Sequence, residues 1–141
     1  MITVMTSVVE RFLETLQEQN WEALGATLSP KEFRRIGPFC DTLTSKTEYV
    51  KFLEGVVSTL GQYRVRTRRI VAGNGADGSS ATVYAEINES FVANGSTMDF
   101  PEVLVFDVGA DGLITQVQVY MMRPGEDALV PGGKAQASTP S

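Results

Sequence analysis

Two glutamates, Glu89 and Glu102, stand at positions where the surrounding sequence calls for apolar side chains. Glu89 lies between Ile87 and Phe91 in an alternating segment, and Glu102 interrupts a second alternating segment in the same way. A carboxyl group in an apolar cavity resists ionisation, and a second carboxyl group nearby raises the apparent pKa of the pair. Such a pair can supply a general acid and a general base near neutral pH. Glu102 and Glu89 are therefore the candidate catalytic residues.

The 141-residue chain contains no histidine and a single cysteine, Cys40. The lack of histidine excludes Ser-His-Asp and Cys-His nucleophile systems and every histidine-ligated metal site. A lone cysteine forms no internal disulfide, and we expect Cys40 to be a small buried hydrophobic residue. Proton transfer must then use Asp, Glu, Tyr, Lys or the cysteine, and we expect neither a metal nor another cofactor.

The composition is that of one globular domain, with 43% hydrophobic residues and a formal net charge of −5. The acidic balance argues against a general nucleic-acid-binding protein. No apolar run approaches the roughly 20 residues that a membrane-spanning helix needs, and the first residues lack the pattern of a signal peptide. We therefore expect a cytoplasmic protein with no nucleic-acid or membrane partner.

The placement of the two glutamates depends on a β-hairpin at Asn94-Gly95, a dipeptide typical of tight turns. Pairing of the flanking strands around this turn places Glu89 opposite Phe100 and Glu102 opposite Ile87. The two carboxyl groups would then share one face as diagonal neighbours, roughly 7–8 Å apart at Cα. A register slip or a β-bulge would instead place one of them in solvent.

Three helical segments precede the strands. Ser-x-x-Glu capping boxes predict helix starts at Ser7 and Ser45, Asn20 predicts a third start, and Gly61 is expected to stop the last helix. Four alternating segments then predict strands at residues 63–71, 81–92, 97–108 and 113–122. Helices followed by antiparallel strands indicate an α+β domain.

The composition changes after Arg123, where the sequence becomes rich in Pro, Gly, Ala and Ser. We therefore expect one domain over residues 1–123 and a disordered C-terminal tail over residues 124–141.

Three segments carry a family resemblance: RFLETLQEQNWEALGATLS, TEYVKFLEGV and EVLVFDVGADGLITQVQVYM. They resemble the nuclear transport factor 2-like superfamily, which includes SnoaL-like polyketide cyclases, steroid Δ-isomerases and limonene-1,2-epoxide hydrolases. The resemblance covers about residues 7–123. It implies a cone-shaped α+β barrel, with N-terminal helices packed on a curved, mostly antiparallel sheet, but it does not fix the reaction.

The steroid isomerases supply one matching acid. Their oxyanion-stabilising tyrosine matches Phe12, and their general-base aspartate falls at Ile36-Gly37, so neither group is present. Their second oxyanion acid, an aspartate, matches Glu102. The resemblance therefore argues against steroid isomerisation by the usual arrangement.

The epoxide hydrolases supply the other matching acid. Their water-holding Tyr-x-Asn pair matches Phe33 and Arg35, and their Arg-x-Asp pair matches Ile87 and Glu89. Their final aspartate falls near Met122. One carboxyl group of that relay, Glu89, is thus retained without its partners.

We expect an apolar pocket between the helices and the concave face of the sheet, with a small lipophilic molecule as its ligand. Besides the two glutamates, its expected ligand-binding residues are Phe12, Phe33, Arg35, Phe39, Phe100, Val119 and Met121.

Two functions stay open. The replaced relay residues slightly favour a non-catalytic binding or assembly domain, and the alternative is a cofactor-independent isomerase, cyclase or epoxide-hydrolase-like enzyme with Glu102 as acid and Glu89 as base. The outer sheet face is expected to form a homodimer.

Overall fold

The structure is a computed structural model that describes residues 2–75 and 78–123. The tail expected at residues 124–141 lies outside the described residues. In chain order the elements are α1 (Ile2–Glu18), α2 (Trp21–Gly25), β1 (Arg34–Ile36), β2 (Thr42–Leu43), α3 (Lys46–Val57), β3 (Gly61–Asn74), β4 (Ala81–Ala93), β5 (Ser96–Val108) and β6 (Ile114–Met121).

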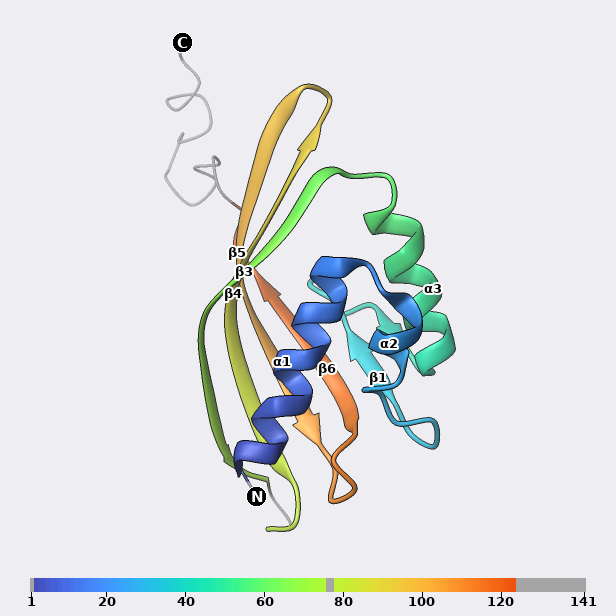
Figure 1. Ribbon diagram of the computed structural model, residues 1–141, viewed down its shortest axis with the longest axis vertical. Helices are drawn as coiled ribbons and strands as arrows, with labels where there is room; N and C mark the ends of the chain where they lie inside the picture. Colours follow the sequence, from blue (N-terminus) through green and yellow to red (C-terminus); the bar gives the residue numbers. More distant parts are fainter. Residues whose placement is uncertain (1, 76–77, 124–141) are drawn as a thin grey trace.

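The described strands form one curved sheet in the order β2-β1-β6-β5-β4-β3, and the three helices cover one side of it (Figure 1). Every neighbouring pair is antiparallel except β1 and β6, which run parallel. This arrangement confirms the predicted α+β cone fold. The short strands β1 and β2 complete the sheet on the side away from β3.

The hairpin between β4 and β5 has the register that the sequence predicts. Glu89 pairs with Phe100, and Ile87 pairs with Glu102. Asn94 and Gly95 both have positive φ angles, 52° and 77°, which suits the two-residue turn expected there.

The first helix starts earlier than predicted. It begins at Ile2, so Ser7 lies inside the helix and is not its N-cap. Met5 is buried in the core and extends the apolar face of α1 toward the N-terminus, which explains why the helix does not wait for the capping box.

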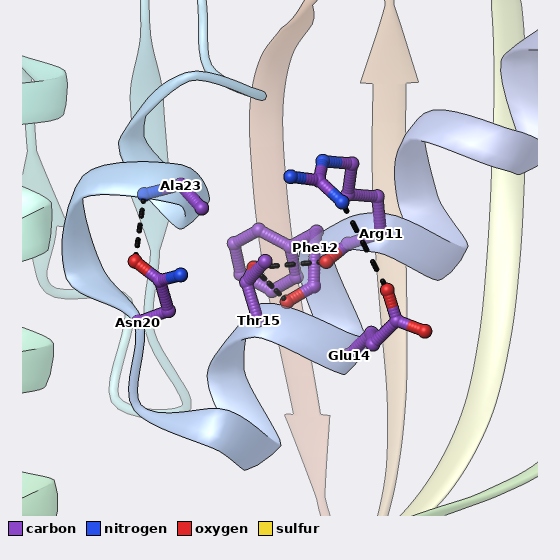
Figure 2. A network of polar contacts seen from close by, with 6 residues as sticks. All are labelled: Arg11, Phe12, Glu14, Thr15, Asn20 and Ala23. Carbon is purple, nitrogen blue, oxygen red and sulfur yellow. Dashed lines mark hydrogen bonds and ion pairs between the residues drawn. The ribbon is translucent and has the colours of Figure 1, made fainter.

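The other two predicted N-caps are confirmed. The Asn20 side chain accepts a hydrogen bond from the backbone N–H of Ala23, as Figure 2 shows, and Ser45 accepts one from Glu48. The third helix ends at Val57, earlier than the predicted stop at Gly61, which is instead the first residue of β3.

A buried hydroxyl near the end of α1 is fully used within the helix. Thr15 Oγ1 donates to the carbonyl oxygens of Arg11 and Phe12, at 2.8 and 3.0 Å (Figure 2). Burial of this helix face therefore leaves no unpaired hydroxyl, and the free-energy penalty of burying one is avoided. Phe12 follows the same face into the core.

Aromatic rings link the helices to the sheet. Phe12 packs edge-to-face on Phe106 of β5, with ring centroids 5.3 Å apart, and stacks against Tyr49 of α3. Tyr49 in turn stacks against Phe33, with ring centroids 5.4 Å apart. No helix of the described residues is long and apolar enough to span a membrane.

Cys40 is exposed, and the expectation that it is buried is wrong. It lies in the turn after β1 with a φ of 64°, and its N–H donates to the carbonyl of Gly37. The tight turn turns both Cys40 and its neighbour Phe39 outward.

We predict that Phe106→Ala lowers the free energy of unfolding by about 3–5 kcal/mol, because the ring is fully buried against Phe12. Urea denaturation followed by circular dichroism measures the change. Phe39→Ala is the matched control: its side chain is 78% exposed, so we expect a change within about 0.5 kcal/mol. Equal losses in the two variants would contradict this placement of the core.

Candidate functional site

A cavity of about 330 Å³ lies between the helices and the inner face of the sheet. Helices α1 and α3 form one wall, and strands β1, β4, β5 and β6 form the other. Its lining is Phe12, Leu16, Arg35, Tyr49, Phe52, Leu53, Val56, Val57, Leu60, Ile87, Glu89, Phe91, Phe100, Glu102, Leu104, Val119 and Met121. Most of these side chains are apolar, so the few polar groups stand out as the chemically active part of the wall.

The structure brings most of the predicted site residues to this cavity. Glu89 and Glu102 line it, together with the predicted ligand-binding residues Phe12, Arg35, Phe100, Val119 and Met121.

Two predicted lining residues lie elsewhere. Phe33 is buried, but it packs behind Tyr49 rather than on the cavity wall. Phe39 is exposed in the turn after β1 and does not contribute to the cavity, because that turn directs it into solvent.

The two glutamates meet a tyrosine in a row that crosses three neighbouring strands. The hydroxyl of Tyr63, on β3, donates to Glu89 Oε2 on β4. Glu102 on β5 lies close enough to Glu89 for a side-chain hydrogen bond that raises the pKa of Glu102. A hydrogen bond between two carboxyl groups requires a proton on one of them, so the pair shares a proton.

Glu102 is the member of the pair that holds this proton. Its side chain is almost fully buried, with 4% exposure. Burial, followed by the hydrogen bond to Glu89 and the negative charge of Glu89, raises the pKa of Glu102 far above its usual range, while the Arg35 guanidinium opposes the shift. Glu102 therefore stays protonated at neutral pH.

The two tyrosines of the site remain protonated. Burial raises the pKa of Tyr63, and the charge and hydrogen bond of Glu89 raise it further. Burial also raises the pKa of Tyr49, although Arg35 acts in the opposite direction. Both phenols can therefore donate hydrogen bonds, and neither serves as a base near neutral pH.

Among the described residues that line the cavity, Arg35 is the one cation. Its Nη1 contacts Asp41 Oδ2 at 2.9 Å, and its guanidinium lies 4.7 Å from the centroid of the Phe52 ring. Its Nε and Glu102 Oε2 are the two buried side-chain atoms of the described residues for which the structure gives no hydrogen-bond partner. Unpaired buried polar atoms at a cavity are natural contacts for a ligand.

Sequence reasoning missed both tyrosines. Tyr49 falls in the apolar stripe of a helix and Tyr63 in an alternating strand, so each looks like an ordinary core aromatic residue. The absence of histidine makes tyrosines candidates in general, but only the pairing of β3 with β4 brings Tyr63 to Glu89.

The described residues offer no group of three or more His, Cys, Asp and Glu side chains that could hold a metal ion. What they assemble is a protonated carboxyl group, a carboxylate, two phenols and a guanidinium around an apolar space. This set can bind an oxygen-bearing apolar molecule and move a proton.

Comparison with known proteins places the chain in a fold family. The profile of the SnoaL-like domain matches residues 9–117. A candidate ketosteroid isomerase from Kribbella flavida has 21% sequence identity and a TM-score of 0.69, over 92% of this chain and 90% of its own. An M. tuberculosis epoxide hydrolase of the limonene-epoxide-hydrolase-like type has 24% identity and a TM-score of 0.69, over 86% of this chain and 84% of its own.

A third similar structure is the orange carotenoid protein of Anabaena (Nostoc), solved with canthaxanthin, at 16% identity and a TM-score of 0.67. The match covers 81% of this chain and 35% of that protein. A search of curated protein sequences gave no match. At these identities the solved structures establish the fold alone.

We predict that the stability of the protein falls with rising pH because of Glu102. The folded chain keeps the Glu102 proton at pH values where the unfolded chain, with a glutamate pKa of about 4.3, has lost it. The folded state then binds more protons, so the free energy of unfolding decreases above about pH 4 until Glu102 itself ionises.

The comparison of wild type with Glu102→Gln measures this contribution. Relative to the variant, we expect wild type to lose up to about 1.4 kcal/mol per pH unit between pH 5 and pH 8 in urea unfolding experiments. Glu54→Gln, at an exposed position of α3, is the control and should keep the wild-type slope. Parallel curves for wild type and Glu102→Gln would contradict a buried, protonated Glu102.

Proposed function

The chain belongs to the SnoaL-like domain family, within the nuclear transport factor 2-like superfamily, and we propose that its cavity binds a small lipophilic molecule and catalyses proton transfer on it. Glu102 is the general acid and Glu89 is the general base. The observation that carries this proposal is the placement of two glutamates on the wall of one apolar cavity, with the Glu102 side chain almost fully buried.

The acid and the base have separate tasks. The Glu89 carboxylate, held by the Tyr63 hydroxyl, accepts a proton from a substrate carbon or from a water molecule. Glu102 donates its proton to the substrate oxygen on which negative charge develops. The hydrogen bond between the two carboxyl groups then lets the proton return to Glu102, so the site resets without a cofactor.

The apolar wall supports a lipophilic substrate. Rings of α3, β4 and β5 surround the carboxyl pair, and Phe91 stacks on Phe100 with centroids 5.6 Å apart. Relatives with this fold include a protein that binds the carotenoid canthaxanthin and an epoxide hydrolase. Isomerisation, cyclisation and epoxide opening can all use one group that donates a proton and another that accepts one.

A non-catalytic binding domain is the second candidate. The positions that match the epoxide-hydrolase relay carry Ile87 and Met122, and the position that matches the isomerase tyrosine carries Phe12. Ile87 is apolar and buried in the core, so the missing relay residue has no ionisable replacement at this position. The sequence alone slightly favours this candidate, whereas the coupled carboxyl pair favours catalysis.

We predict that wild-type protein is stabilised by members of a panel of terpenoid, steroid and polyketide-like molecules, and that it converts a terpenoid epoxide or an unsaturated ketone from the same panel. Thermal shift measures binding, and product analysis measures turnover. Glu89→Gln should retain binding and lose roughly 100-fold or more in rate, the usual size of a general-base contribution. Glu86→Gln, on the outer face of the same strand, is the control and should keep the wild-type rate.

Carbon NMR of the glutamate carboxyl groups separates the two candidates. If Glu89 and Glu102 both titrate near pH 4, the acid–base proposal fails. If the panel gives thermal shifts without turnover, the binding domain is the correct function. If nothing in the panel binds, both candidates lose their main support.

We also propose that the protein forms a homodimer through the outer face of the sheet. Val71 and Tyr84 are exposed neighbours on β3 and β4, and Tyr120 is exposed on β6. Between them lie Val103 and Val105 of β5, so the centre of this face is less polar than the alternation suggests. A patch of this kind, with arginines along β3 at its rim, resembles an interface between copies.

We predict that Tyr120→Glu shifts the protein from dimer to monomer, because the new charges would face each other in a desolvated interface. Sedimentation velocity at several concentrations measures the oligomeric state. Lys51→Glu, on the exposed side of α3, is the control and should remain dimeric. A monomeric wild type at all concentrations would contradict the proposal.

A further inference from the structure

The polar row across the inner face of the sheet is interrupted at β6. From one side it runs through Tyr63, Glu89 and Glu102 on β3, β4 and β5. On the other side Arg35 stands on β1, which neighbours β6 in the sheet. Strand β6 itself contributes only Val119 and Met121 to the cavity wall. An apolar strand thus separates the acid–base pair from the cation.

Each side of this interruption carries one unpaired buried atom. Glu102 Oε2 is unpaired on the β5 side, and Arg35 Nε is unpaired on the β1 side. An unpaired carboxyl oxygen on one side of β6 and an unpaired N–H on the other match a ligand with two polar groups. The proposed function assigns Glu102 to the reacting oxygen, which leaves Arg35 for the second group.

The Arg35 side chain is held in place and incompletely neutralised. Only 10% of the Arg35 side chain is exposed, whereas its partner Asp41 is 52% exposed and contacts the guanidinium at Nη1. Gly37 lets the turn close over this ion pair, because a Cβ at that position would lie 2.6 Å from Arg35 Nη1 and 2.4 Å from Asp41 Oδ1. The guanidinium also lies over the Phe52 ring, 4.7 Å from its centroid, and this contact restrains it further. The remaining donor edge is therefore pre-positioned and loses little freedom when a ligand binds.

We propose that the ligand of this cavity carries a carboxylate that binds to the free Nε–H edge of Arg35, an inference that rests on the proposed function of the same cavity. A guanidinium fork matches a carboxylate better than any neutral group, and its charge is countered so far only by a half-exposed aspartate. Glu89 is the other acidic group of the cavity that could pair with Arg35. It lies on β4, beyond Glu102 in the strand order, and accepts a hydrogen bond from Tyr63 instead.

This assignment makes Arg35 a specificity-determining residue rather than a proton carrier. With the carboxylate at Arg35, the apolar part of the ligand crosses Val119 and Met121, and its reacting oxygen reaches Glu102. The substrate class is a small lipophilic carboxylic acid with a second oxygen-bearing group.

Isothermal titration with octanoate and octanamide tests the inference, because the two molecules share one alkyl chain and differ only in the head group, a charged carboxylate in one and a neutral amide in the other. We expect wild type to bind octanoate about tenfold or more tightly than octanamide, the size typical of a charge-assisted hydrogen bond. Arg35→Gln should reduce this preference to about twofold or less. Arg34→Gln should leave it unchanged, since Arg34 lies next in the chain but is exposed and bonds Gln116.

Asp41→Asn is a second test, which keeps Arg35 and therefore does not depend on the folding of the Arg35→Gln variant. Removing the competing carboxylate should strengthen octanoate binding without strengthening octanamide binding, an effect that a purely structural role of Arg35 would not produce. Equal binding of the two molecules by wild type, or an unchanged preference in Arg35→Gln, would overturn the inference. Failure of both to bind would also overturn it, while the carboxyl titration by NMR would still judge the proposed function independently.

Discussion

The proton shared by Glu89 and Glu102 is the constraint on which the rest of the site depends. Two ionised carboxylates cannot lie together in an apolar cavity, because burial and mutual repulsion both oppose the second charge. One proton removes that charge, and the Tyr63 hydroxyl stabilises the charge that remains. The surrounding helices bury Glu102 and so keep it protonated. The chemistry of the site therefore depends on the packing of the core.

The backbone geometry that brings the two carboxyl groups together is local. Side chains alternate between the faces of a strand, so a slip of one strand by one residue would move its glutamate to the outer face. The Asn94-Gly95 turn prevents this slip by fixing which residues of β4 and β5 face each other. The same two turn residues therefore determine the stability of the hairpin and the existence of the acid–base pair.

This locality explains what the sequence can and cannot predict. The hairpin register, the caps at Asn20 and Ser45 and the α+β architecture follow from short patterns, and the structure has them. The contact of Tyr63 with Glu89 and the outward turn of Phe39 do not follow from any short pattern. The first needs strand pairing between residues far apart in the chain, and the second needs the backbone conformation of the turn after β1.

The two ends of the polar row differ in their access to water, and this difference gives them different tasks. Asp41 is half exposed, so the Arg35–Asp41 pair can keep both charges and still leave one donor edge for a charged ligand group. Glu102 is almost fully buried, so the carboxyl pair can be stable only by holding a proton. Charge recognition therefore belongs at the end where ions are tolerated, and proton transfer belongs at the end where a second charge is not.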